Sequence, residues 1–147
     1  MTRLLLLHGP NLNRLGRRDP AHYGTLTLAE LEARVRVRAR SRGVGIRAFQ
    51  SNCEGALIDE IQRAGDDPDC LGAIVNAGAL SHTSYALHDA LVDFGRPVVE
   101  VHLSQVSARE PWRRVSVIRP ACIAAIEGKG AAGYDEAVDR LLSAAGR

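Results

Sequence analysis

The 147-residue sequence predicts a doubly wound α/β domain. Apolar runs of strand length alternate with helix-length amphipathic segments, which is typical of βαβ units and a parallel sheet. The runs are almost continuously apolar, which indicates a sheet covered by helices on both faces. The chain is long enough for one domain with a core and short for two, so we expect a single domain over residues 1–147.

Five strands and four long helices are expected in alternation. The apolar runs of the strands are residues 3–8, 44–49, 71–77, 97–103 and 121–127. A capping box of Thr27 and Glu30 predicts the start of the first helix, and its apolar face carries Leu28, Leu31, Val35 and Ala39. The other helices are expected at 54–65, 82–94 and 134–145. This order of elements favours a five-stranded parallel sheet of the flavodoxin type.

The composition argues against several classes of partner and cofactor. A net charge of +2 gives no reason to expect nucleic acid or a membrane as the main partner. The arginines at alternate positions from 34 to 42 are interpreted as a solvated helix surface. Lys129 is the only lysine, so it alone could form a Schiff base.

The cysteines and histidines indicate neither a disulfide framework nor a metal site. Cys53, Cys70 and Cys122 are odd in number and widely spaced, so we expect reduced thiols and a cytoplasmic protein. Cys53 is interpreted as a small buried residue. No histidine stands at a close ligand spacing from another histidine or a cysteine, and no metal is expected.

Polar side chains gather where the predicted strands end. Ligands of parallel α/β sheets bind outside the carboxyl ends of the strands. Glu100 and His102 are two residues apart on one strand, so they face the same way, and a carboxylate in that place fixes the tautomer of the imidazole. The other polar residues at strand ends are His8, Asn11, Gln50, Ser51, Asn52, Asn76 and Ser104.

Residues 128–133, GKGAAG, spell the glycine pattern of a dinucleotide site. That pattern requires an acidic ribose ligand about twenty residues further on, beyond the last residue. A glycine-rich connection is therefore favoured, and a nucleotide- or flavin-binding module is kept as an alternative function.

Four stretches resemble the type II 3-dehydroquinate dehydratases. They match the motifs of that family in order and at the expected spacing, over nearly the whole chain. The stretches are HGPNLNRLGRRDPAHYG (8–24), QSNCEGALID (50–59), NAGALSHTSYALHDAL (76–91) and EVHLSQVSAREPWR (100–113). The resemblance implies a flavodoxin-like fold and a dodecamer built from trimers. It also implies dehydration of 3-dehydroquinate to 3-dehydroshikimate, in the shikimate or quinate pathway, with no metal or cofactor.

The resemblance also implies roles for individual residues. Tyr23 is expected to be the general base, activated by Arg18, because a phenol ionises near pH 10 in water and needs a nearby positive charge. His102 is expected to be the general acid, oriented by Glu100. The residues expected to position water or bind substrate are Asn11, Asn76, His82, Leu103, Ser104, Arg113 and, from a neighbouring subunit, Asp89.

The sequence departs from the family pattern at several positions. Cys53 stands where the family often has His, and His88 where Arg is common. Gln105 and Ser107 replace a usual Asn and His, and Pro111–Trp112 replaces an acidic–aromatic pair. None of these changes removes a proposed catalytic group. A catalytically silent relative is the further alternative that the departures raise.

Overall fold

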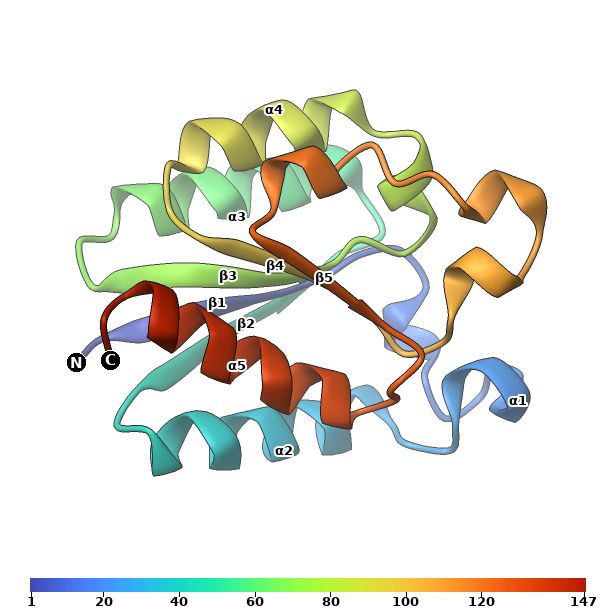
Figure 1. Cartoon of the computed structure of the whole chain (residues 1–147), viewed down its shortest axis with the longest axis horizontal. Coiled ribbons are helices and arrows are strands. Elements are labelled where there is room, and N and C mark those ends of the chain that lie inside the picture. Colours follow the sequence, from blue (N-terminus) through green and yellow to red (C-terminus); the bar gives the residue numbers. More distant parts are fainter.

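The computed structural model describes residues 1–147 and is organised around one five-stranded sheet (Figure 1). The strands are β1 (Arg3–His8), β2 (Gly45–Gln50), β3 (Cys70–Asn76), β4 (Val98–His102) and β5 (Ala124–Glu127). Their order is β2-β1-β3-β4-β5, and every neighbouring pair is parallel. This is the flavodoxin-like order, so the predicted fold class is confirmed.

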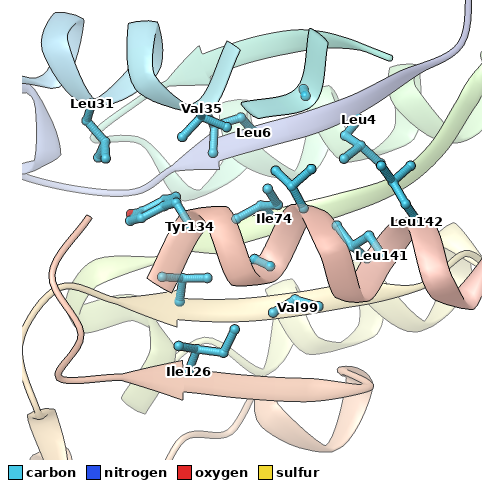
Figure 2. Close-up of a cluster of buried hydrophobic side chains, with 14 of the residues drawn as sticks. Leu4, Leu6, Leu31, Val35, Ile74, Val99, Ile126, Tyr134, Leu141 and Leu142 are labelled. Carbon is cyan, nitrogen blue, oxygen red and sulfur yellow. The ribbon is translucent and has the colours of Figure 1, made fainter. Parts of the chain in front are cut away.

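Long helices cover both faces of the sheet (Figure 1). Helices α2 (Leu28–Ser41) and α5 (Ala132–Ala144) lie on one face, and α3 (Glu54–Asp66) and α4 (Tyr85–Phe94) lie on the other. Because side chains alternate along a strand, the leucines of β1 supply both layers of the core. Leu4 and Leu6 join the cluster under α2 and α5, which Figure 2 shows together with Tyr134, whereas Leu5 and Leu7 join the cluster under α3 and α4.

The helix boundaries follow from side-chain caps. The Thr27 hydroxyl accepts from the Glu30 amide at 3.2 Å, and the Glu30 carboxylate accepts from the Thr27 amide at 3.3 Å, so the predicted capping box is present. The helix predicted at 82–94 begins only at Tyr85, because the Ser84 hydroxyl caps it by accepting from the Leu87 amide at 3.0 Å.

The strand predicted at 121–127 is also shorter than expected. A single 3-10 turn at Arg119–Ala121, with Pro120 inside it, precedes β5, which begins at Ala124. The short helix α1 (Pro20–Tyr23) was not predicted; Asp19 caps it by accepting from the Ala21 amide at 3.0 Å. The other 3-10 turns are Leu12–Arg14, Gly78–His82, Val106–Ala108 and Pro111–Arg113.

Glycines shape two of the connections that leave the sheet. A Cβ atom on Gly9 would lie 2.4 Å from the Ala77 carbonyl oxygen, so only glycine lets the segments after β1 and β3 run this close together. Residues 128–133 join β5 to α5 with Gly128 and Gly130 at φ +76° and +56°, which agrees with a glycine-rich connection.

One expectation about surface residues is confirmed and one is wrong. The arginines of α2 lie on a solvated surface, as predicted, where three of them also form ion pairs: Arg34 pairs with Asp135 at 2.8 Å, and Arg38 and Arg42 pair with Asp139 at 2.5 and 2.6 Å. These three arginines are four residues apart, so they share one side of the helix, which faces α5. Cys53 is exposed rather than buried, because it occupies the turn just before α3. None of the helices is long and apolar enough to cross a bilayer.

Leu6→Ala tests the central position of β1. Leu6 is fully buried, so the change removes apolar contacts and leaves a cavity, and we expect a loss of about 2–5 kcal/mol in the free energy of unfolding. Chemical denaturation measures the loss. The control is Val37→Ala on α2, where the side chain is 70% exposed and a change within about 0.5 kcal/mol is expected.

Candidate active site

A pocket opens at the carboxyl ends of β1, β3 and β4. It collects side chains from the segments that follow these three strands and from α1. Nine residues predicted from the sequence line it, namely Asn11, Arg18, Tyr23, Asn76, His82, His102, Leu103, Ser104 and Arg113. Glu100 lies directly behind His102, and Asp89 lies elsewhere.

The Tyr23 hydroxyl lies between two guanidinium groups. It accepts a hydrogen bond of 2.8 Å from Arg18 and another of 2.8 Å from Arg109. Arg18 also stacks on the phenol, with its Cζ atom 3.7 Å from the ring centroid. Two guanidinium groups thus lie at hydrogen-bond distance from one phenol oxygen in a partly buried setting.

Arg109 is the functional candidate that the sequence analysis missed. It follows the 3-10 turn Val106–Ala108 and is separated from Tyr23 by 86 residues, so no local spacing connects the two. Its Nη1 atom also lies 3.4 Å from the Ser104 hydroxyl. Its Nε atom is buried without a hydrogen bond, 3.7 Å from a Glu110 carboxylate oxygen. The signal available in the sequence was its position within the stretch SQVSARE, seven residues after His102.

Glu100 and His102 form a buried pair on β4. His102 Nε2 lies 2.5 Å from a Glu100 oxygen, which leaves Nδ1 as the ring nitrogen free of Glu100. The His102 side chain is 5% exposed and the Glu100 side chain is 0% exposed. Burial by itself would raise the pKa of Glu100, but the hydrogen bonds and charges of His102 and Arg119 outweigh it and hold that pKa below its usual value. Glu100 is therefore a carboxylate at neutral pH.

The two asparagines are held by their neighbours. Asn11 has a left-handed backbone with φ 72°, and its backbone N–H donates to the Asn52 side-chain oxygen at 3.0 Å. Asn76 donates to the Tyr134 hydroxyl at 3.0 Å and accepts from the Gly78 amide at 3.1 Å. Because its carbonyl and amide ends both have partners, the Asn76 side chain has a fixed orientation at the pocket.

The remaining wall of the pocket is aromatic and basic. The His82 ring stacks parallel to His102 at 6.4 Å and meets Trp112 edge-on at 5.5 Å. His82 Nδ1 donates to the Val115 carbonyl at 2.7 Å, so Nε2 is the ring nitrogen that has no part in this contact. Arg113 donates to Glu110 at 2.7 Å and keeps a charge at the rim.

Asp89 is not part of the pocket of its own chain. It lies on α4, its side chain is 81% exposed, and its one polar side-chain contact is with the His88 ring at 3.2 Å. A role for Asp89 therefore requires another subunit.

The fold and the site define a class of protein. An α/β domain that brings an arginine-bound tyrosine and a carboxylate-bound histidine to the carboxyl ends of its strands has the groups of a general acid–base enzyme. Comparisons with known proteins identify the family. The model of the dehydroquinase class II family matches residues 2–142, so the chain belongs to that family.

Relatives agree in sequence and in structure. A 3-dehydroquinate dehydratase of Anoxybacillus flavithermus is 50% identical over 97% of this chain and 95% of its own length. A catabolic 3-dehydroquinase 1 of Neosartorya fischeri is 47% identical over 94% of this chain and 91% of its own. The crystal structure of a type II dehydroquinase from Butyrivibrio crossotus superposes with a TM-score of 0.92 at 39% identity, covering 96% of this chain and 97% of that one.

Glu100→Gln tests the charge of the buried carboxylate. A carboxyl whose pKa is lower in the folded protein than in the unfolded chain stabilises the fold above its unfolded pKa, and this contribution is lost as the pH falls through the folded pKa. We expect the wild-type protein to lose more unfolding free energy than Glu100→Gln between about pH 5 and pH 3. Urea denaturation at several pH values measures the difference. Parallel curves for the two proteins would contradict the assignment of a charged Glu100.

Proposed function

We propose that this chain dehydrates 3-dehydroquinate to 3-dehydroshikimate, with Tyr23 as base and His102 as acid. The observation that carries the proposal is that one pocket holds a phenol bonded by two guanidinium groups and an imidazole bonded by a buried carboxylate. The names of the relatives support the same substrate.

The first half of the reaction removes a proton beside the ketone. The Tyr23 phenolate, stabilised by Arg18 and Arg109, takes the proton, and the electrons of the broken C–H bond move into an enolate. Asn11 and Asn76 line the same pocket and supply amide groups that hold a water molecule or the enolate oxygen. The fixed orientation of Asn76 means that little reorganisation accompanies the new charge.

The second half expels the β-hydroxyl group. His102, charged beside Glu100, donates a proton to the departing hydroxide, so the leaving group is water. The electrons of the enolate form the carbon–carbon double bond as the carbon–oxygen bond breaks.

The substrate is anchored away from the reacting carbons. The Leu103 and Ser104 amides and the Ser104 hydroxyl bind the carboxylate, and His82 and Arg113 bind hydroxyl groups, all from positions that line the pocket. Residues 128–133 contribute nothing to this pocket, so the nucleotide-binding alternative has no support there.

Tyr23→Phe tests the base. The change keeps the ring on which Arg18 stacks and removes the group that accepts the proton, so we expect a folded protein that binds substrate and turns over at least a hundredfold more slowly, on the order of a general base's contribution. The absorbance of the conjugated enone carboxylate in the ultraviolet measures turnover. Arg17→Ala is the control, because Arg17 is exposed and outside the pocket. Near-normal turnover by Tyr23→Phe would sink the assignment.

We also propose that the chain assembles into trimers, with a dodecamer as the larger assembly. Tyr85, Asp89 and Val92 lie on one side of α4, since they are spaced by four and three residues. Tyr85 and Val92 are 71% and 54% exposed, which leaves apolar surface on the helix face that carries Asp89. Burying this face against a second copy would deliver Asp89 to the site of the neighbouring chain.

Subunit mixing tests this arrangement. Asp89→Ala and Tyr23→Phe are each expected to be weakly active alone. After dissociation and joint reassembly, about a quarter of the sites combine an intact Tyr23 with an intact Asp89 from the neighbour, and activity returns to about that fraction of wild type. The control mixes Tyr23→Phe with His102→Ala, whose lesions lie in the same chain's pocket, and recovers none. Equal recovery in both mixtures, or in neither, would refute the contribution across subunits.

A further inference from the structure

Two basic side chains, rather than one, contact the buried Glu100 carboxylate. His102 takes one oxygen at 2.5 Å. Arg119, from the 3-10 turn before β5, lies across the carboxylate, with Nε 3.3 Å from one oxygen and Nη2 3.4 Å from the other. The Ser116 hydroxyl donates to Glu100 at 2.9 Å. Glu100 therefore divides its charge between the imidazole that faces the pocket and a guanidinium that lies behind it.

Arg119 in turn lies between two carboxylates. Its Nη2 atom is 3.7 Å from an oxygen of Glu127, the β5 residue that pairs in register with His102. That oxygen is buried and has no hydrogen bond, so Arg119 is the cation that faces it. The other Glu127 oxygen accepts from the Ser107 hydroxyl. Ser107 is one of the positions where the sequence departs from the family pattern, and here it anchors Glu127.

We propose that Arg119 is a positioning residue for the Glu100–His102 pair, and that Glu127 limits its hold on Glu100. The proposal rests on the proposed role of His102 as the acid. Arg119 fixes the Glu100 carboxylate in the orientation that His102 requires and keeps it charged. Glu127 competes with Glu100 for Arg119 and so weakens the attraction between Arg119 and Glu100. The Glu100 carboxylate therefore remains able to stabilise the His102 imidazolium.

The surrounding groups leave this role to Arg119. His82, Arg109 and Arg113 face the pocket side of His102 and are not hydrogen-bonded to Glu100. Burial and the charge of Glu100 raise the pKa of the nearby Cys122 thiol to about 12, so that group is neutral. Burial lowers the pKa of Arg119, but Glu100 and Glu127 more than compensate and raise it, so Arg119 is charged throughout the working range.

Two substitutions are expected to act in opposite directions. Arg119→Gln removes a cation that stabilises the carboxylate, so Glu100 takes up its proton at higher pH and the acidic limb of the kcat profile moves up by about half to one unit. Glu127→Gln removes an anion that competes for Arg119, so the same limb moves to lower pH. KM stays within about twofold in both variants, because neither residue lines the pocket. Arg119→Lys keeps a positive charge, so the acidic limb of its kcat profile is expected to lie close to the pH of the wild-type limb.

The matched control is Arg140→Gln, an exposed arginine paired with Glu136, which leaves the profile unchanged. A ¹³C NMR titration of the Glu100 carboxyl, assigned with Glu100→Gln, provides a readout that needs no turnover. An upward shift of the Glu100 titration in Arg119→Gln supports the role of Arg119 even if the protein shows no dehydration activity. The role of Arg119 and the proposed function can therefore be refuted separately. Shifts of the same sign in Arg119→Gln and Glu127→Gln, or no shift in either, would overturn it. Should Arg119→Gln not fold, the downward shift in Glu127→Gln decides the matter alone.

Discussion

The direction in which the chain leaves β1 and β3 is the constraint on which the site depends. In the order β2-β1-β3-β4-β5 the chain turns one way after β1 and the other way after β3, so the connections diverge and leave a crevice at the carboxyl ends. Gly9 and Ala77 keep the two connections in contact at the base of that crevice. The Asn11 and Asn76 segments then form its walls, and His102 reaches it from the next strand.

Charge is divided within the pocket in a way that suits proton transfer in both directions. The proposed base accepts hydrogen bonds from two arginines, Arg18 and Arg109. The proposed acid is backed by an anion, Glu100. The charges beside the two groups come from residues that need not change protonation in the proposed reaction.

The sequence was informative where function follows from local rules. Strand ends predicted that Asn11, Asn76 and His102 would converge, and the two-residue spacing predicted that Glu100 would face His102. It was uninformative where contacts join distant segments. Neither the approach of Arg109 to Tyr23 nor the ion pairs of the α2 arginines with α5 has a local signature, because the partners are brought together only by the closed fold. Cys53 was predicted to be buried because cysteine is commonly a buried residue, but it lies in the exposed turn before α3.

The two arginines at Tyr23 come from different parts of the chain. Arg18 belongs to the same short segment as Tyr23, whereas Arg109 comes from the far end of the chain's third quarter, beyond β4. The Tyr23 hydroxyl therefore meets both guanidinium groups through a contact between two segments that are far apart in the sequence. The activation proposed for Tyr23 thus depends on the tertiary fold as well as on its own short segment.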